Sequence, residues 1–398
     1  MAVAVVVSGV RSIDAAERGH RLARRHRIAP HLRAPDLAEA IDSVVCLHAT
    51  DPSTVYLSTL ARCAGFRIEQ LDHALYDERS VVKHLAMRRT LWVVPRHLLG
   101  AVQVAASDRV AARERARLIK EVEAAGLFGD GSAWLDDASA QVLAALDGHE
   151  LSSTELRGAL PVLEGALTQG EGRSWEVTAP IAPRVLTVLA AQGLAVRATN
   201  DGAWRVSRPR WTAMASWLGG PVERPEHDRA VDDVVEAWLR SFGPGTEVDL
   251  KWWLGSTLGV VRASLARIGA VEVDLDGARG WVLADDVDPE PEVAPWVALL
   301  PGLDPTTRGW SDREWYLGEH RPQIFDSAGN AGPSIWADGR IVGGWRQDDD
   351  GAVELQVLDD VGAEALAAID LEAARLTEWL GGTRVMLRFP SPLWQQRG

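Results

Sequence analysis

The spacing of apolar residues predicts helices through the first third of the chain. Residues 13–26 have the pattern of a basic helix. A second helix is predicted to begin after Pro35-Asp36 and to end near Thr50, because apolar residues recur in it at helical spacing, at Leu37, Ile41, Val44 and Val45. Asp51 and Pro52 are residue types favoured at the N-cap and first position of a helix, which predicts a third helix running to Cys63.

A short helix and a strand pair are predicted next. Residues 68–75 fit a helix of two turns, and Gly65 separates it from the preceding helix. The segments 81–84 and 90–94 are rich in β-branched and aromatic residues and fit a short ribbon. Three helices followed by a ribbon is the element order of a winged helix-turn-helix.

The pattern of a long helix followed by a hairpin is predicted twice more. The first copy has a helix at 178–192 and strands at 194–197 and 203–206, on either side of the turn signal Asn200-Asp201-Gly202. The second copy has a helix at 256–268 and strands at 271–275 and 280–283 around Asp276-Gly277. Helices at 132–146 and 228–242 precede the two copies, and Ser152-Ser-Thr-Glu155 is a capping signal for a further short helix.

The character of the sequence changes after the acidic, proline-rich segment 285–295. Short strand-like segments dominate from Trp296, with one helix at 363–380; the predicted strands are 297–300, 323–325, 333–337, 340–346, 353–358 and 384–389. We therefore predict a mainly α fold with β wings, of the α+β class. It consists of three tandem winged-helix units, at 11–110, 130–220 and 225–285, followed by a small β-rich, barrel-like domain at 296–398.

Composition narrows the class of protein. A chain of 398 residues with 46% apolar and 25% charged residues is typical of a globular protein of several domains. The apolar start MAVAVVVSGV has neither a basic leading segment nor a cleavage site, and no apolar run approaches the ~18 residues of a membrane span. Two cysteines in so long a chain fit a reducing compartment. We expect a cytoplasmic protein with no membrane partner.

The charge is unevenly distributed along the chain. The net charge is −14, yet residues 1–120 hold 19 Lys and Arg against 12 Asp and Glu, and the remainder holds 23 against 44. Such asymmetry suggests a basic face on one part of the molecule and an acidic body elsewhere. Heavy use of arginine in a GC-rich genome is an alternative explanation, because Lys83, Lys120 and Lys251 are the only lysines.

Arginines concentrate around one predicted hairpin. Arg197, Arg205, Arg208 and Arg210 flank the Asn200 turn and suit contacts to DNA phosphates, although a solvated hairpin would have the same composition. Arg88 and Arg89, between the strands of the first ribbon, are further candidates. No phosphate-binding loop or dinucleotide fingerprint is present, and Cys46, His48 and Cys63 lack a second ligand pair, so neither a cofactor nor a metal is expected.

Four segments together resemble the AlkZ/YcaQ-type DNA glycosylases, a family of winged-helix DNA-binding proteins. They are Leu47-His-Ala-Thr-Asp-Pro52; Met87-Arg-Arg-Thr-Leu-Trp-Val-Val-Pro95; Phe242-Gly-Pro-Gly-Thr246 with Asp249 and Trp252-Trp253; and Leu300-Pro-Gly-Leu-Asp-Pro305 with Asp338-Gly-Arg-Ile-Val-Gly-Gly-Trp345. The resemblance implies three tandem winged-helix units around a DNA groove and a C-terminal β-barrel. It also implies a substrate of double-stranded DNA carrying alkylated purines.

The resemblance places the family's catalytic motif at His48 and Thr50. The family has glutamine at both positions, or glutamine and aspartate, and members that protect producers of DNA-alkylating antibiotics are similar in varying this motif. His48 would orient or deprotonate a water, Thr50 would hydrogen-bond that water or the sugar, and Asp51 would stabilise positive charge. The implied activity is hydrolysis of N7- or N3-alkylated purines, including bulky natural-product adducts or cross-links.

Each of these residues also has a structural interpretation. His48 falls on the face of the predicted helix that carries Ile41 and would then be a core histidine or a residue favouring the helix C-terminus. Asp51 fits an N-cap, and Thr50 fits a helix terminus. With no lysine close to the motif in sequence, Lys83 being the nearest, a Schiff-base step is not expected and the glycosylase should be monofunctional.

Two other classes of function remain open. A winged-helix protein that lost the two glutamines would be a non-catalytic DNA-binding protein or transcriptional regulator. The acidic body would alternatively serve a structural or partner-binding protein. We expect a monomer in each case, and base release from alkylated duplex DNA separates the enzyme from the other two.

Overall fold

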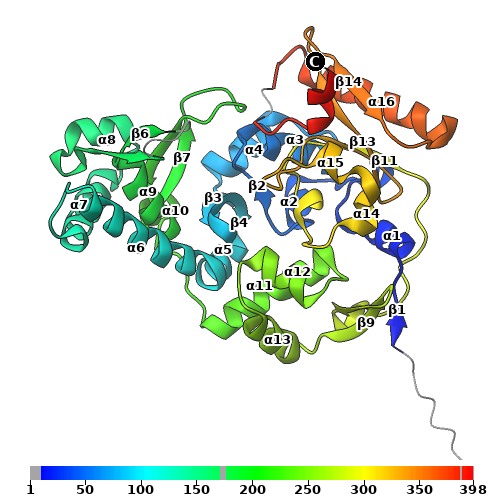
Figure 1. The fold of residues 1–398 in the computed structure, drawn as a ribbon, viewed down its shortest axis with the longest axis horizontal. Helices are drawn as coiled ribbons and strands as arrows, with labels where there is room; N and C mark the ends of the chain where they lie inside the picture. The colour runs from blue at the N-terminus through cyan, green and yellow to red at the C-terminus, as the bar shows by residue number, and fades with distance from the viewer. Residues whose placement is uncertain (1–9, 171–175, 386–387, 398) are drawn as a thin grey trace, which may run out of the picture. The chain divides into compact units, whose positions relative to one another are not determined.

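The computed structural model describes residues 10–170, 176–385 and 388–397 as a mixed fold of helices and strands (Figure 1). The mixed α/β character agrees with the predicted α+β class. The chain divides into two compact units, one made of residues 1–45, 57–66 and 235–398 and the other of residues 46–56 and 67–234. Two helices, α3 (Pro52–Arg62) and α11 (His227–Phe242), connect them. Among the described residues, no helix is long and apolar enough to cross a membrane.

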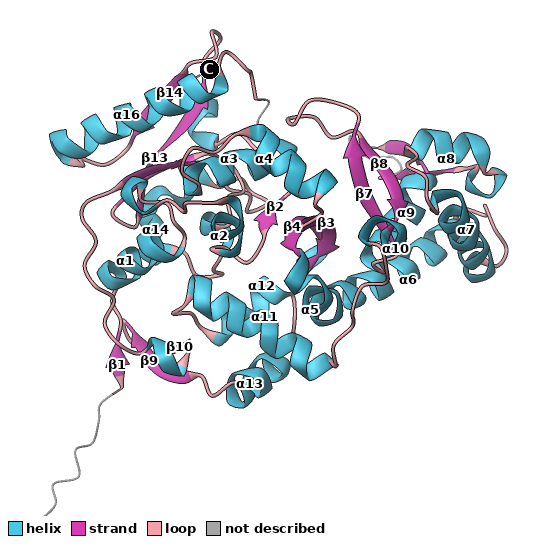
Figure 2. Ribbon diagram, turned by 180° about the vertical axis from the view of Figure 1, so that it is seen from behind, coloured by secondary structure: helices cyan, strands magenta, loops and turns pink. Residues whose placement is uncertain are grey.

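A three-stranded sheet lies at the start of the second unit. Its strands are β2 (Leu47–His48), β3 (Val81–Ala86) and β4 (Thr90–Pro95), arranged in the antiparallel order β2-β4-β3 (Figure 2). The ribbon predicted at 81–94 is confirmed as the pair β3–β4. Its edge is extended by β2, which the sequence did not predict.

The prediction of one helix from residue 37 to near Thr50 is wrong in its second half, because α2 (Leu37–Asp42) ends at Asp42. Val45 adopts a positive φ of 63°, which is costly for a β-branched residue. Pairing of Leu47 and His48 with β4, together with the hydrogen bond from Ala49 N to Leu91 O at 2.8 Å, offsets this cost. Tertiary pairing therefore overrides the local helical pattern.

The rest of the second unit packs helices around two hairpins. Its other elements are α4 (Ile68–Asp72), α5 (Leu99–Val102), α6 (Asp108–Ala124), α7 (Gly131–Leu146), α8 (Ser153–Ala159), β5 (Ala166–Gln169), β6 (Val177–Pro180), α9 (Ala182–Ala191), β7 (Ala195–Asn200), β8 (Pro209–Ala213) and α10 (Met214–Leu218). Helices α6, α7 and α9 share one apolar core, which includes Leu118, Leu135, Val142, Leu186 and Leu189. The capping box predicted at Ser152 and Glu155 is confirmed at the start of α8.

The arginine-rich hairpin differs from its prediction in one strand. Residues 203–206 were predicted to be the returning strand, but β8 begins only at Pro209, so residues 201–208 form a loop (Figure 2). Asn200 holds this loop, because its side-chain amide donates to Val206 O at 2.9 Å and its Oδ1 accepts from Arg208 N at 2.8 Å. The helix predicted at 178–192 is likewise shorter, since residues 177–180 pair with β5.

The first unit begins with a helical part. It contains β1 (Arg11–Ser12), α1 (Ala15–Arg25), α2, α12 (Glu247–Leu254), α13 (Leu258–Arg267), β9 (Val271–Leu275) and β10 (Ala278–Val282). The helices and hairpin predicted at 228–283 are present in that order, and β1 adds a parallel strand to the hairpin. Aromatic residues form part of the core of this unit, where Trp238 and Phe242 of α11 pack with Trp310.

The C-terminal part of this unit is an open sheet. Strands β11 (Val297–Leu300), β12 (Ser334–Ala337), β13 (Arg340–Gln347) and β14 (Val353–Val357) pair in sequence order, with α14 (Glu314–Leu317), α15 (Arg321–Ile324) and α16 (Gly362–Leu380) beside them. Closing a barrel requires the first and last strands to pair. Among the described residues β11 and β14 do not pair, and α16 packs against both, so no closed barrel is found and the barrel-like arrangement is not confirmed.

Two strand predictions in this part are wrong. Residues 323 and 324 belong to α15, where proline at its second position favours a helical start, and Phe325 forms an isolated bridge with Ala331. The described residues of 384–389 form no strand, and residues 386–387 lie outside the described part of the chain.

Candidate functional site

His48 lies in the sheet of the second unit rather than on a helix. It is directly opposite Trp92 of β4, which is in turn opposite His84 of β3. Directly opposed residues project from the same face of a sheet, and the rings of His48 and Trp92 meet edge-on with centroids 5.2 Å apart. His48 is only 4% exposed, which gives it the surroundings of a core residue.

His84 shows the effect of this face on an imidazole. Its Nε2 lies 2.9 Å from Ser107 Oγ, and its side chain is buried. Burial lowers the pKa of His84 to about 4, only partly offset by the charge of Asp108. The ring is therefore neutral at physiological pH.

Thr50 and Asp51 occupy the junction between β2 and α3. Asp51 is buried, and its Oδ1 accepts hydrogen bonds from Ser53 N at 3.0 Å and Ser53 Oγ at 2.7 Å. Ser53 is the second residue of α3, so this contact is the one an N-cap makes. Thr50 is half-buried and is the most exposed of the three candidate residues.

The opposite face of the same sheet opens into a cleft. Lys83 is opposite Val93, which is opposite Leu47, so the lysine projects away from the face of His48. The cleft is lined by Ala49, Pro52, Val55, Tyr56, Tyr76, Lys83, Leu91, Arg197, Asn200, Trp204, Val206, Ser207 and Pro209. We call it the Lys83 cleft. All of these residues belong to the second unit.

Lys83 is the lysine that the sequence indicates as nearest to the motif. Two strand spacings of about 4.8 Å separate Lys83 from Leu47 across the sheet. Proximity between neighbouring strands is invisible in a chain where the two residues are far apart in sequence. Its side chain points to the other face from His48, so this proximity gives no reason to add a Schiff-base step at the motif.

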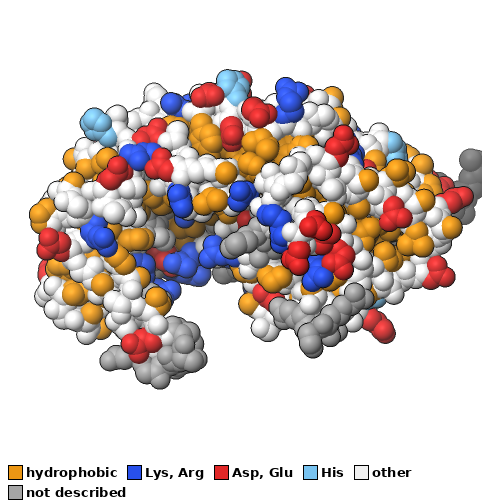
Figure 3. Space-filling model, turned by 90° about the horizontal axis from the view of Figure 1, so that it is seen from above, with side chains coloured by type: hydrophobic (Ala, Val, Ile, Leu, Met, Phe, Trp, Pro, Cys, Tyr) orange, Lys and Arg blue, Asp and Glu red, His pale blue; other side chains and the backbone are white. Residues whose placement is uncertain are grey.

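The predicted DNA-binding arginines fall into different environments. Arg205 and Arg208 are exposed in the loop of residues 201–208, and within the described part of the chain neither forms an ion pair. Arg210 on β8 instead pairs with Asp201 at 3.0 Å and Glu155 at 3.1 Å. Figure 3 shows basic and acidic side chains interspersed on the face it draws. The ion pairs therefore distinguish Arg205 and Arg208, which are available to phosphates, from Arg210, whose charge is already paired. The composition of the hairpin does not make this distinction.

Arg197 belongs to the cleft as well as to the hairpin. It lies on β7, and its guanidinium is 5.3 Å from the centroid of the Trp211 ring. The hairpin prediction grouped it with Arg205 and Arg208, but its neighbours in the cleft are Lys83 and Trp204.

Arg88 and Arg89 form the turn between β3 and β4. Both have a positive φ, 56° and 62°. Arg89 Nε lies 2.8 Å from Glu114 Oε2 of α6, so the charge of Arg89 is paired within the protein. A positive φ is strained for arginine and persists only where the surrounding structure holds the backbone, as the strands β3 and β4 do on either side of this turn.

A family model described as DNA glycosylase AlkZ-like matches residues 41–379, which is most of the chain. The chain belongs to the AlkZ-like DNA glycosylase family. It is 27% identical over 270 residues to an interstrand DNA cross-link repair glycosylase of Streptomyces sahachiroi, a match that covers 64% of this chain and 68% of that protein. The solved structure of Streptomyces sahachiroi DNA glycosylase AlkZ matches with a TM-score of 0.74 at 23% identity, over 95% of this chain and 99% of the other, and this likeness shows the fold.

Membership of the AlkZ-like family makes this protein a DNA glycosylase, as the sequence predicted. The matched region contains the motif at His48, Thr50 and Asp51, and also the whole Lys83 cleft. One of the segments that carry the resemblance has a structural role: Asp304, in Leu300-Pro-Gly-Leu-Asp-Pro305, is fully buried against Arg62.

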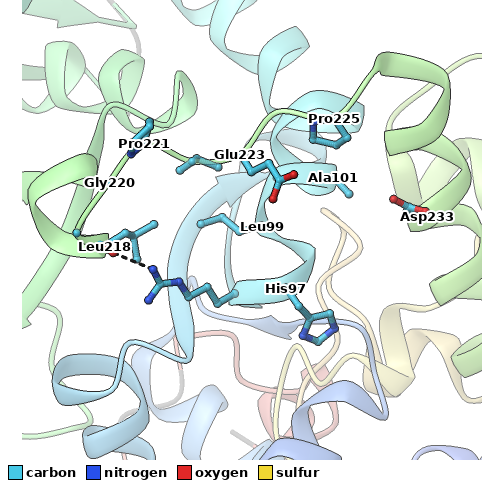
Figure 4. Close-up of a pocket in the computed structure, with 13 residues that line it drawn as sticks. His97, Leu99, Ala101, Leu218, Gly220, Pro221, Glu223, Pro225 and Asp233 are labelled. Carbon is cyan, nitrogen blue, oxygen red and sulfur yellow. Dashed lines mark hydrogen bonds between the residues drawn. The ribbon is translucent and has the colours of Figure 1, made fainter.

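A second cavity of this glycosylase, of about 430 Å³, is less suited to DNA (Figure 4). It lies where residues 218–225 pass residues 96–101, and Glu223 and Asp233 are among its lining residues. Arg96 Nη2 donates to Leu218 O at 2.8 Å across it. Carboxylates repel a phosphate, so this cavity is the weaker candidate for binding a DNA backbone, although its volume exceeds the roughly 20 Å³ of the Lys83 cleft.

Sequence reasoning missed the aromatic part of the Lys83 cleft. Tyr56, Tyr76 and Trp204 come from three separate segments, and only tertiary structure brings them together. One signal was available for Lys83. A lysine in the centre of the strand Val81-Val-Lys-His-Leu85 interrupts an apolar run, which marks a position whose side chain reaches a polar group.

Proposed function

We propose that this DNA glycosylase hydrolyses the N-glycosidic bond of N7- and N3-alkylated purines in duplex DNA, including purines that cross-link the two strands. The observation that carries the proposal is the family match over residues 41–379, which includes polar residues at both positions of the motif, His48 and Thr50. Cross-links are included because a relative with 27% identity is an interstrand DNA cross-link repair glycosylase.

The chemistry requires little from the protein. An alkylated purine is already a cation, so its bond to C1′ is weakened before the enzyme acts. Water attacks C1′, the electrons of the C1′–N bond return to the purine, and the base leaves as a neutral molecule. One proton of the water must go to a base, and the oxocarbenium-like transition state must be stabilised.

His48 is proposed as the group that orients this water and takes its proton. A neutral imidazole is a suitable base near pH 7. Because His48 is 4% exposed, a water held against it would be nearly free of bulk solvent. Thr50, which is half-buried at the same junction, would hydrogen-bond the water or the sugar.

Asp51 is proposed to act through its charge. Its Oδ1 is engaged by Ser53, which fixes the carboxylate at the start of α3. A fixed carboxylate stabilises positive charge on the sugar without reorganising during the reaction. The same contact makes Asp51 an N-cap, so its two roles must be separated by experiment.

The proposed binding surface uses the helix-and-hairpin units. We propose three tandem winged-helix units, at 11–110, 130–220 and 225–285, with Arg88, Arg89, Arg197, Arg205, Arg208 and Arg210 as the arginines that contact phosphates. The protein is proposed to act as a monomer in the cytoplasm. Phosphate contacts position the protein, and the lesion supplies selectivity through its weakened bond.

Base release from defined duplexes tests the proposal. One duplex carries a single N7-methylguanine, a second carries a nitrogen-mustard cross-link between guanines, and a third is undamaged. We expect abasic sites, revealed by alkaline strand cleavage, in the first two and not in the third. Release from neither damaged duplex, by a folded protein that binds DNA, would contradict the proposed substrates and favour a non-catalytic DNA-binding protein.

A further inference from the structure

We infer that the Lys83 cleft binds one phosphate of the DNA backbone between Lys83 and Arg197, with the adjoining sugar or base against Trp204. This inference rests on the proposed action on duplex DNA. It assigns to this cleft a function that is separate from the chemistry proposed for His48 on the other face of the sheet.

The position of Lys83 points to an anion. Lys83 Nζ donates a hydrogen bond of 2.7 Å to Tyr76 Oη, and it lies 4.9 Å from the centroid of the Tyr76 ring. Within the described residues, Tyr76 is the one side chain that Nζ contacts by a hydrogen bond, and no carboxylate lies within ion-pair distance. An ammonium group has three donors, so it retains the capacity to bind an incoming oxygen anion.

Arg197 adds a second positive charge to the same cleft. Burial lowers the pKa of Lys83 to about 8, with the positive charge of Arg197 as the next cause and Asp72 opposing both. The two cations therefore repel each other across a partly desolvated space. A phosphate between them would reduce this repulsion.

Asp72 is the carboxylate whose charge acts on Lys83. Asp72 Oδ1 accepts a hydrogen bond of 2.5 Å from Tyr56 Oη. Asp72 is thus engaged by Tyr56, and no carboxylate is among the described residues that line the cleft. In the second cavity, by contrast, Glu223 and Asp233 are themselves part of the lining.

Aromatic side chains make the cleft suited to a nucleotide rather than to a bare ion. The rings of Tyr56 and Trp204 lie 5.2 Å apart and are tilted by 52°. Trp204 is half-buried and comes from the loop of residues 201–208, which also carries the exposed Arg205 and Arg208. Flat apolar surfaces beside cations favour the sugar and base that adjoin a phosphate.

Binding of a phosphate should be linked to protonation of Lys83. Below about pH 8 the amine is already charged in the free protein, so affinity should not vary with pH. Above it, binding must also protonate the amine, so affinity should fall. The tyrosines do not contribute in this range, because burial raises the pKa of Tyr76 to about 12 and that of Tyr56 well above its usual value.

The test is the affinity for an undamaged duplex, measured by fluorescence anisotropy from pH 6.5 to 9.5 at constant ionic strength. For the unaltered protein we expect a constant Kd up to about pH 8 and a rise of roughly tenfold by pH 9.5. Lys83→Arg should abolish this rise, because a guanidinium stays charged. Lys83→Gln should bind weakly and independently of pH, and its log–log salt slope should be smaller by about one. Lys120→Gln, at an exposed lysine of α6, is the matched control and should behave as the unaltered protein.

Three results would overturn the inference. The first is a pH profile that Lys83→Arg leaves unchanged, and the second is an unchanged salt slope in a folded Lys83→Gln protein. The third is that inorganic phosphate stabilises the unaltered protein against unfolding while the Lys83 variants bind DNA as it does, which would indicate a site for free anions. Thermal unfolding establishes that each variant is folded, and Lys83→Arg keeps the test decisive if Lys83→Gln is not. The duplex in this test is undamaged, so base release by the unaltered protein is measured in a separate experiment. A protein that releases no base is thereby distinguished from a protein whose cleft binds no phosphate.

Discussion

Arg62 and Asp304, which are 242 positions apart in sequence, form a two-pronged ion pair that is completely buried. Nη1 donates to Oδ2 at 2.8 Å and Nη2 to Oδ1 at 2.6 Å. Ser58 Oγ donates to the same carboxylate, and Thr306 N does so as well. This network connects α3 to the segment between β11 and β12 within one unit.

Asp304→Ala should destabilise the protein strongly. Removing the carboxylate leaves the guanidinium of Arg62 buried without its counter-charge, which typically costs about 3–5 kcal/mol. Urea unfolding monitored by tryptophan fluorescence measures the loss. Asp233→Ala breaks the ion pair with Arg229, whose side chain is 75% exposed, and should change stability by less than about 1 kcal/mol. Equal effects of the two substitutions would contradict the role given to Asp304.

His48→Ala should reduce excision of N7-methylguanine by about 10²–10⁴-fold, the usual contribution of a positioned acid–base group. DNA affinity should remain within a few-fold. His48→Gln restores the side chain that the resemblance places at this position, so it should recover part of the rate. Single-turnover base release measures both variants, with His97→Gln, at an exposed residue of the second cavity, as the control. Wild-type rates in a folded His48→Ala protein would exclude His48 from the chemistry.

Substitutions of Asp51 separate capping from charge stabilisation. Asparagine caps a helix nearly as well as aspartate, so Asp51→Asn should keep the stability of the protein, whereas Asp51→Ala should lose about 0.5–2 kcal/mol. If the carboxylate stabilises the transition state, Asp51→Asn should nevertheless lose excision activity. Retention of the full rate in Asp51→Asn would leave Asp51 with the capping role alone.

The two exposed arginines of the hairpin loop should dominate its contribution to DNA binding. Arg205→Ala together with Arg208→Ala should reduce the log–log salt slope by about one to two units, because each neutralised phosphate contributes about 0.9. Arg210→Ala should change the slope less, since Asp201 and Glu155 already neutralise that charge. Anisotropy titrations between low and moderate salt test this order. A larger effect of Arg210→Ala would mean that its ion pairs exchange for phosphate when DNA binds.

His84 should make the protein less stable in mild acid. Its pKa in the folded protein is lowered to about 4, whereas in the unfolded chain it is near 6.5. Between these values the unfolded state binds the extra proton, so stability is fully present above about pH 6.5 and falls as pH is lowered towards 4, by roughly 3 kcal/mol in total. His84→Gln should flatten this part of the profile, whereas His149→Gln, at an exposed residue, should not. A profile unaffected by His84→Gln would assign the acid sensitivity to other groups.

The sequence by itself determined much of the element order and the family. Periodicity identified the long helices, capping signals identified starts such as that of α8, and the motifs spread between Leu47 and Trp345 indicated a DNA glycosylase. Periodicity, capping signals and short motifs each involve residues that are close together in sequence. Local interactions therefore suffice to encode them.

Only the tertiary structure decided where the candidate residues face. The segment Leu37–Thr50 has a helical pattern, yet pairing with β4 draws Leu47 and His48 into a sheet and buries the imidazole. The alternation of side chains across that sheet then places Lys83 on the face opposite His48, where tyrosines and a tryptophan from distant segments form a cleft. Strand pairing is set by long-range hydrogen bonds and shared burial, which the pattern of a single segment does not contain.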